Sequence, residues 1–289
     1  MTSGSAASGR PVPRLDHVMV LLDGAAHRDV SSSGFLAERF GRIKRKEAES
    51  SVAGQYSTLG VAGENTLIEL FGSDMPSASP LTGGLVFSFE EPGSAERARA
   101  LLDAAGEVRY HHDLVRRTVE GTNEQQPWYH LISVDLGEAS PLLLFLNEVT
   151  PEYFQSLGAR PEPDGRLSRK SYLDAALGAA AGGKGLMRDV TGVTLSVGAE
   201  RGRRLADVLA VFGYVGAETA PGVLRELRGP GLTVRLETGD GMERVKEIEI
   251  GLNPEAYDPS IPGEFRFGES SRLVIESAET VRWSFTPTR

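Results

Sequence analysis

The feature that most constrains the fold is a repeated order of predicted elements: one apolar strand, one helix and three further strands. The first copy runs from "LDHVMVLLD" (15–23) through a helix at 33–42 to a strand in "NTLIELFGS" (65–73). A second copy starts at "GGLVFSFE" (83–90) and a third at "VTGVTLSVG" (190–198). Repetition of a βαβββ unit predicts an α+β chain, with helices packed on one face of each sheet.

The helices of the second and third copies have apolar residues at helical spacing. Ser94 and Gly106 stand where a helix over 94–105 would need its first and last caps. The positions that form one apolar stripe are Ala98, Leu101, Leu102 and Ala105 in the second copy, and Leu205, Val208, Leu209 and Phe212 in the third. The segment after 244 predicts strands only, with a proline-rich loop (253–263) where a helix would be expected. We interpret it as a fourth module that has lost its helix.

These elements predict two domains. Residues 1–14 are small, polar and proline-containing, without the apolar segment of a signal peptide, so we expect a disordered tail. The modules at 15–156 would form an N-terminal two-module domain, and the polar, proline-bearing stretch 157–170 a linker. Residues 171–289 would form a second domain with a degenerate last module.

Composition excludes several classes of function. A net charge of −9 and a pI near 5.2 argue against a nucleic-acid partner, because phosphate binding needs a surplus of Lys and Arg. The chain has no cysteine, so any bound metal must be held by His, Asp, Glu or water. No apolar stretch approaches the ~18 residues of a membrane span. We therefore expect a cytoplasmic protein that does not bind membranes.

Several motifs resemble a known superfamily. "LDHVMVLLD" and "LIELFGS", at the two ends of the first module, are similar to the vicinal oxygen chelate superfamily. That superfamily includes glyoxalase I, extradiol dioxygenases, and fosfomycin and bleomycin resistance proteins. The stretches "SGFLAERF", "PWYHLISVD", "FLNEVTPEYF" and "SRKSYLDAAL" resemble a bacterial family of two-domain glyoxalase-like proteins of unknown function. The resemblance covers most of 15–252 and implies that pairs of βαβββ modules curl into cups.

The resemblance also implies a metal site. In such proteins each module can give one ligand from its first strand and one from its last. His17 matches the first of these positions and Glu69 the second, whereas Gly84 stands where the second module would supply its first-strand ligand. Glu148 matches the remaining position, although an alignment shifted by three residues puts Phe145 there. One imidazole and two carboxylates suit a divalent ion such as Fe, Mn, Zn or Ni.

Other side chains have alternative interpretations. A lone Glu in an apolar strand often pairs with an Arg, and a lone His is often a hydrogen-bonded packing residue. His130 is a candidate for the vacant ligand position or for acid–base catalysis. Tyr56, Trp128 and Tyr129 are candidate pocket aromatics that would fit a core equally well. No histidine follows His130, which excludes the usual dioxygenase metal site in the second half and leaves that half as scaffold or pocket wall.

Three hypotheses about function follow. The first is a metal-dependent lyase, isomerase or dioxygenase that acts on a small metabolite with adjacent oxygens and uses His17, Glu69 and Glu148. The second is a metal-free protein that sequesters a small molecule, like bleomycin-binding relatives. The third is a cofactor-free enzyme with Glu69 or His130 as the acid–base group. Because two modules can pair within one chain, we expect a monomer or a weak homodimer.

Overall fold

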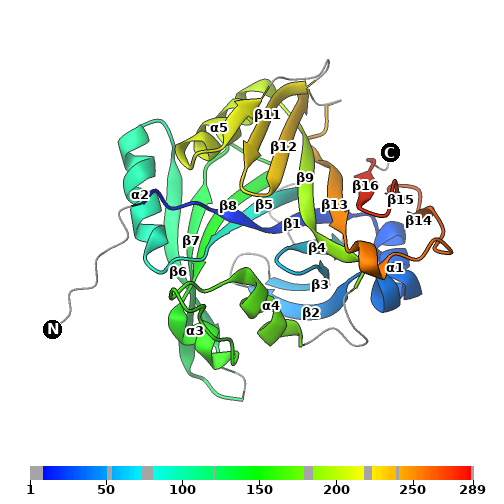
Figure 1. Cartoon of the computed structure of the whole chain (residues 1–289). Helices are drawn as coiled ribbons and strands as arrows, with labels where there is room; N and C mark the ends of the chain where they lie inside the picture. Colours follow the sequence, from blue (N-terminus) through cyan, green and yellow to red (C-terminus); the bar gives the residue numbers. More distant parts are fainter. Residues whose placement is uncertain are drawn as a thin grey trace.

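A computed structural model describes residues 9–50, 54–72, 81–119, 121–178, 185–217, 223–238 and 241–287. The side chains of 46–50 and 54–57 fall outside this description, as does the predicted tail up to residue 8. The described chain forms two eight-stranded sheets with a few helices (Figure 1). The α+β class predicted from the repeat is therefore confirmed. None of the described helices is long and apolar enough to cross a bilayer.

The first sheet consists of two modules joined by their first strands. Its strands are β1 (Arg14–Leu22), β2 (Arg42–Ser50), β3 (Gly54–Ala62), β4 (Leu67–Gly72), β5 (Gly83–Phe89), β6 (Tyr110–Thr118), β7 (Gln125–Val134) and β8 (Leu142–Val149). Their order in space is β2-β3-β4-β1-β5-β8-β7-β6. β1 and β5 pair antiparallel at the centre, and the last strand of each module lies parallel to its first. The paired-module arrangement is thus the one expected from the resemblance.

The second sheet repeats this arrangement. Its strands are β9 (Met187–Val197), β10 (Val215–Ala217), β11 (Val223–Gly229), β12 (Leu232–Thr238), β13 (Arg244–Leu252), β14 (Glu264–Phe267), β15 (Ser271–Ile275) and β16 (Thr280–Phe285). Their order is β10-β11-β12-β9-β13-β16-β15-β14. β9 and β13 pair antiparallel at the centre, so the chain holds two sheets of the same topology.

The first helix begins earlier than the sequence predicted. Helix α1 spans Gly24–Ser32, and only a short π-helix, Leu36–Phe40, lies within the predicted range 33–42. The Asp23 carboxylate accepts hydrogen bonds from the amides of Ala25 and Ala26, which stabilises the start of α1. Burial of Ala26 and Val30 then holds the helix against the core, although its sequence has few strong helix formers.

Helices α2 (Ser94–Ala105) and α5 (Ala199–Val211) lie where they were predicted. Gly106 ends α2 in the left-handed conformation (φ 74°), which glycine adopts without steric cost. The predicted cap Ser94 is instead the first helical residue, and the N-cap is Gly93. Glu148 of β8 supplies the missing acceptor, because its carboxylate receives the amides of Gly93 (2.7 Å) and Ala95 (2.5 Å).

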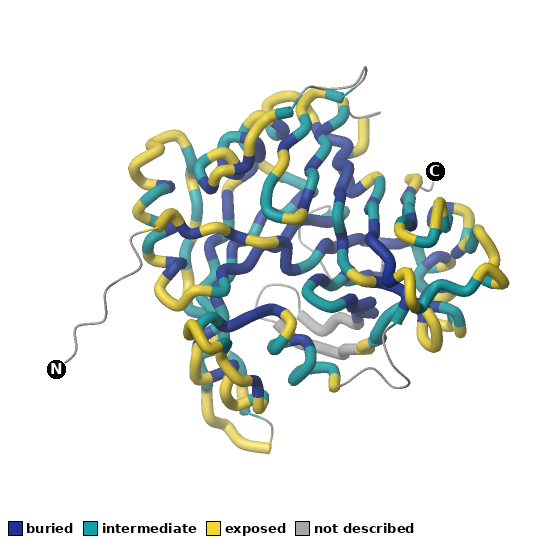
Figure 2. Tube along the Cα trace, in the orientation of Figure 1, coloured by how far each residue is buried: buried dark blue, intermediate teal, exposed yellow. Residues whose placement is uncertain are grey.

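The fourth module lacks an α-helix, as predicted, and the first module covers it instead. Between β13 and β14 there is only a 3₁₀ turn, Pro254–Ala256. Phe35 stacks on Phe265 of β14 at 3.8 Å, and Phe40 meets Trp283 of β16 edge to face at 6.3 Å. Figure 1 shows α1 beside β14. The two halves of the chain therefore share one hydrophobic core, visible as the dark central strands of Figure 2.

The predicted linker packs on the first sheet. Helix α3 (Pro151–Ser156) precedes it, and helix α4 (Arg169–Leu177) begins at its end. Within the linker, the Leu167 amide donates to the Glu90 carbonyl (2.7 Å) and the Arg169 amide to the Glu90 carboxylate (2.9 Å). The domain boundaries at 157–170 stay a prediction, but this segment is tied to the first sheet by specific bonds.

The shared core predicts that damage in the first module destabilises the second sheet. Phe40→Ala, tested in a Trp128→Phe background that leaves Trp283 as the only tryptophan, should lower the free energy of unfolding by about 3–5 kcal/mol. Urea titration followed by Trp283 fluorescence measures this. Met242→Ala, at a position 45% exposed, is the control and should change little. An unchanged Trp283 transition in Phe40→Ala would contradict a shared core.

Candidate functional site

The first sheet has one face covered by helices and one face that carries the candidate site. Along β1, Val18, Val20 and Leu22 face the main core, while alternation turns His17 and Met19 to the other side. We call this second side the open face. A separate apolar cluster forms its floor: Met19, Leu21, Phe71, Val86, Leu143 and Phe145.

An extra residue in β1 brings two polar side chains together at the edge of this floor. Leu15 pairs with Phe87 and His17 with Val86, so Asp16 has no partner of its own on β5 and forms a bulge. The His17 imidazole contacts the Asp16 carboxylate, with 2.7 Å between Nδ1 and Oδ1. The bulge thus lets two consecutive residues interact through their side chains, where a regular strand would turn them to opposite faces.

Glu69 lies next to His17 on the parallel strand β4. Its backbone pairs with Met19, which places its side chain on the open face. Glu69 Oε2 is 3.5 Å from His17 Nε2. The other carboxylate oxygen, Oε1, accepts a hydrogen bond from the Thr58 hydroxyl at 3.0 Å. His17 and Glu69 are therefore brought together. His17 also contacts Asp16, and Glu69 also contacts Thr58.

Asp16 is held in turn by Arg169 of α4. Arg169 Nη2 lies 2.8 Å from Asp16 Oδ1, the same oxygen that contacts His17. Both Asp16 and Arg169 are only 8% exposed. Burial alone would raise the pKa of Asp16, but the Arg169 charge and the His17 hydrogen bond outweigh burial, so this pKa lies below its usual value. Asp16 therefore stays ionised beside the imidazole at neutral pH.

The structure does not bring Glu148 to this pair. Glu148 lies on the helix-covered face with Leu144 and Leu146, and its carboxylate is engaged at the start of α2. Phe145, from the alternative alignment, lies on the open face. A Cβ atom at Gly84 would come within 2.6 Å of the Leu143 carbonyl oxygen, so the close approach of β8 leaves no room for a ligand side chain there.

His130 also lies away from the pair. It is next to Ile132 in alternation and faces the side covered by α2, where its ring stacks on His112 at 5.6 Å. Burial, then the nearby charges of Arg99 and His130, lower the pKa of His112. His27 lies in α1 and is half-buried.

Two of the predicted pocket aromatics, Trp128 and Tyr129, belong to one aromatic cluster with Tyr153. Trp128 meets Tyr129 edge to face at 4.8 Å and Tyr153 of α3 at 5.7 Å. The Arg117 guanidinium lies 5.6 Å from the Trp128 ring centre and donates to the Tyr153 hydroxyl at 2.6 Å. The side chain of Tyr56 lies outside the described residues.

Several polar residues of the open face were not predicted from the sequence to be part of the site. Asn147 Oδ1 and Arg169 Nε are buried atoms without a hydrogen-bond partner among the described residues, and the buried Ser88 hydroxyl helps to lower the pKa of Asp16. Ser88 and Asn147 are direct neighbours on β5 and β8. Asp16 is the sequence neighbour of His17 in "LDH". Arg169, in contrast, is 152 positions away from His17 in sequence, and no local pattern links the two. Unpartnered buried atoms are costly, so this area is suited to bound water or ligand oxygens.

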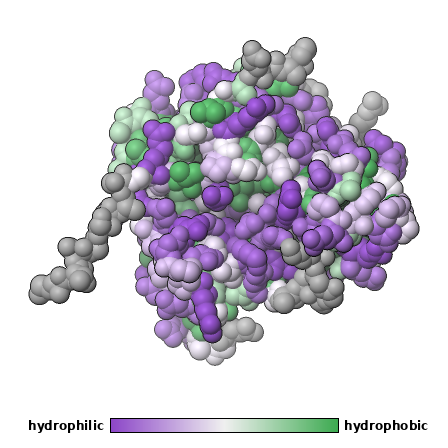
Figure 3. All heavy atoms as spheres, in the orientation of Figure 1, coloured by the Kyte–Doolittle hydropathy of each residue, from purple (hydrophilic) through white to green (hydrophobic). Residues whose placement is uncertain are grey.

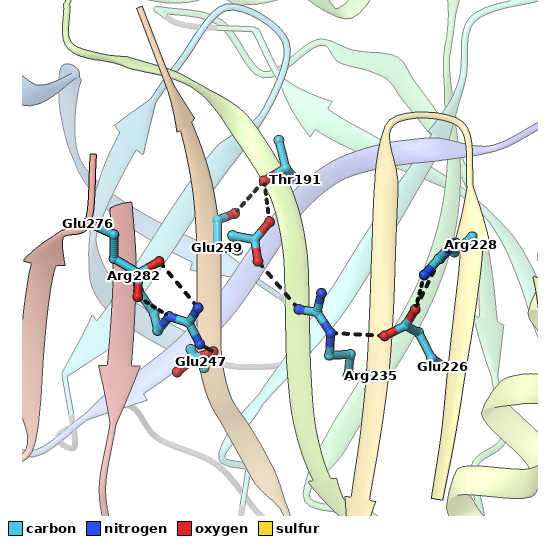
Figure 4. A network of polar contacts seen from close by, with 8 residues as sticks. All are labelled: Thr191, Glu226, Arg228, Arg235, Glu247, Glu249, Glu276 and Arg282. Carbon is cyan, nitrogen blue, oxygen red and sulfur yellow. Dashed lines mark hydrogen bonds and ion pairs between the residues drawn. The ribbon is translucent and has the colours of Figure 1, made fainter. Parts of the chain in front are cut away.

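The second sheet carries a different open face. Figure 4 shows Glu226 and Arg228 on β11, Arg235 on β12, Thr191 on β9, Glu247 and Glu249 on β13, and Arg282 on β16, with Glu276 beside it. Arg235 bridges Glu226 (3.1 Å) and Glu249 (3.5 Å), and Arg282 lies 3.1 Å from Glu247. Each cation here has an acidic partner, and Trp283 is fully buried in the core. Across the described part of the chain, no three His, Asp or Glu residues cluster as a metal site.

A family model described as a family of unknown function (DUF5829) matches residues 15–285, and the chain belongs to this family. No curated protein matches it. The resemblance to vicinal oxygen chelate proteins is confirmed at the level of the fold, because both sheets have the predicted paired-module order.

Three solved structures illustrate the similarity. One is a Mn(II)-bound glyoxalase from Novosphingobium aromaticivorans (10% identity, TM-score 0.46, covering 82% of this chain and 64% of that chain). Another is a hypothetical protein from Staphylococcus aureus (11%, TM-score 0.49, 81% and 88%). A third is a catechol 2,3-dioxygenase (12%, TM-score 0.42, 82% and 69%). The chain thus spans less than two thirds of the glyoxalase. Matches at this level carry no information on activity.

The lowered pKa of His112 predicts a loss of stability in mild acid. Above the usual histidine pKa near 6.5 both states are neutral, whereas below it the unfolded chain gains a proton that folded His112 resists. The free energy of unfolding should therefore fall between pH 7 and pH 5, and less steeply in His112→Gln. Urea titrations at several pH values measure the slope. The exposed neighbour His111→Gln is the control, and an equal slope in wild type and His112→Gln would contradict the assignment.

Proposed function

We propose that this chain is a glyoxalase-like metal-dependent enzyme whose reactive centre is the His17–Glu69 pair. The observation that supports this most is the geometry of the pair. Nε2 and Oε2 lie 3.5 Å apart, while Nδ1 and Oε1 are each occupied by a neighbouring side chain. Two donor atoms are thus held beside one another and left available.

The donor set fits one divalent ion with open positions. Two ligands each about 2.1 Å from an ion lie roughly 3–3.5 Å apart, which matches the Nε2–Oε2 distance. An imidazole and a carboxylate suit Fe, Mn, Zn or Ni. No third protein ligand is present among the described residues, so a closed structural site does not fit. Such a metal, when bound, would supply Lewis acidity toward a substrate with adjacent oxygens.

The surrounding residues would orient the pair and receive the substrate. Asp16 would fix the His17 tautomer that keeps its proton on Nδ1, and Thr58 would fix the rotation of the Glu69 carboxylate. The apolar floor around Met19, Phe71 and Val86 would exclude water below the site. The Ser88 hydroxyl and the buried Asn147 Oδ1, which has no hydrogen-bond partner among the described residues, would hydrogen-bond polar groups of a small substrate.

A second candidate function is acid–base catalysis without a metal. The arrangement Asp16–His17–Glu69 supports it, because an imidazole oriented by a carboxylate on Nδ1 is a general base at Nε2. This alternative needs no third ligand, and none is present among the described residues. Metal binding distinguishes the two.

Metal content tests the proposal. Wild-type protein exposed to Fe, Mn, Zn or Ni and then dialysed should retain near-stoichiometric metal by plasma mass spectrometry. His17→Ala and Glu69→Gln should lose it while remaining folded. Glu148→Gln should keep the metal and instead lower stability by about 1–3 kcal/mol, because its carboxylate holds the start of α2. Wild type that retains none of these ions would reject the metal proposal and leave the acid–base candidate.

For partners, we propose a small-molecule ligand and a monomer or weak homodimer. The strongly exposed large apolar side chains of the described part are four: Val12, Val215, Leu224 and Met242. Figure 3 likewise shows a face that is mostly hydrophilic, with smaller hydrophobic patches. A stable oligomer would need a larger continuous apolar surface.

Light scattering over a concentration series tests this proposal. The measured mass should stay near the 31.0 kDa of one chain and rise toward two chains only at high concentration. A tetramer at all concentrations would contradict it.

A further inference from the structure

Arg169 reaches the candidate site from outside both sheets. It is the first residue of α4, and the segment that carries it follows the last strand of the first sheet. Three contacts fix the start of α4: the amides of Leu167 and Arg169 bind Glu90, and Ser168 caps the helix through the Ser171 amide. The backbone at Arg169 is therefore tied to the end of β5 before its side chain makes any contact.

The Arg169 side chain is buried, and burial of its charge costs free energy unless an acidic group pairs with it. It is 8% exposed, its guanidinium lies 4.8 Å from the centre of the Tyr172 ring, and its Nη2 contacts Asp16 at 2.8 Å. The charge is balanced by Asp16 alone among the ion pairs of Arg169. Burial also raises the pKa of Tyr172, so this ring stays a neutral phenol beside the cation. The guanidinium is thus directed at Asp16.

The shared oxygen links Arg169 to the reactive pair. Asp16 Oδ1 contacts both Arg169 Nη2 (2.8 Å) and His17 Nδ1 (2.7 Å). Without the guanidinium, Asp16 would be a buried, uncompensated carboxylate, and the imidazole would lose a fixed acceptor. Rotation of Asp16 would then free His17 to place its proton on either nitrogen.

We propose that Arg169 is a positioning residue, which holds Asp16 so that His17 keeps its proton on Nδ1 and leaves the Nε2 lone pair, beside the Glu69 carboxylate, for an ion or a substrate proton. This inference rests on the proposed function only in taking His17 as the reactive group. If Arg169 has this role, the site is ordered only when α4 is docked, because the guanidinium that pairs with Asp16 belongs to that helix. A mere anchor for α4 would leave the imidazole unaffected.

The primary test is the ¹⁵N chemical shifts of the His17 ring in the metal-free full-length protein, at a pH where the ring is neutral. Wild type should show protonated Nδ1 and unprotonated Nε2. Arg169→Met, which keeps the length but removes the charge, should give a mixture of tautomers. Arg169→Lys should restore part of the wild-type signal. Arg166→Met is the matched control, since Arg166 lies in the same segment, is 41% exposed and, in the described part of the chain, has its ion pairs with Glu90 and Asp164 rather than with Asp16.

A second readout is the Mn²⁺ affinity of the same variants by calorimetry. Arg169→Met should weaken binding about tenfold, as loss of an outer contact to a ligating histidine does, whereas Arg166→Met should bind like wild type. Wild-type His17 protonated on Nε2, or tautomers unchanged in Arg169→Met, would overturn the positioning role. If wild type does not bind Mn²⁺ but the tautomers respond to Arg169→Met, the proposed metal function fails and the positioning role stands. If Arg169→Met does not fold, Arg169→Gln, which also removes the charge, decides by the same criterion.

Discussion

The candidate site depends on the contacts that the Asp16 carboxylate makes with His17 and Arg169. It lies in a bulge of β1, contacts His17 from the next position and accepts the Arg169 guanidinium from α4. A regular strand would have turned Asp16 away from His17, and an unpaired buried carboxylate would have been costly. One irregularity in one strand therefore joins the central strand pair, the imidazole and a helix far along the chain.

The two sheets have the same topology but different open faces. The first combines an apolar floor with one imidazole, one carboxylate and buried polar atoms that have no partner among the described residues. The second carries a ladder in which Arg235 and Arg282 are matched by glutamates, so its charges satisfy one another. The second half instead contributes packing, because its last module is covered by α1 and by Phe35 and Phe40 of the first. The two sheets therefore share one architecture, but the candidate reactive residues lie on the first sheet.

Much of this fold could be predicted from sequence, because the module pattern is local. Alternating strands and the apolar stripes of α2 and α5 report on nearby residues. The approach of His17 to Glu69 was instead expected from the resemblance to the superfamily, through their positions in the module. The predictions that failed concerned features that depend on tertiary contacts. Helix α1 is stabilised by the Asp23 cap and by burial more than by its own propensity, and the role of Ser94 is taken by Glu148 from a distant strand. Arg169 could not be assigned to the site, because its partner Asp16 lies 153 residues away in sequence.

The most direct test of the central claim is anomalous X-ray diffraction from crystals of the full chain grown with Mn²⁺. We expect an anomalous peak within about 2.0–2.3 Å of both His17 Nε2 and Glu69 Oε2, with Asp16 still bridging His17 and Arg169. A structure in which Mn²⁺ binds elsewhere while Nε2 and Oε2 remain in direct contact would contradict it.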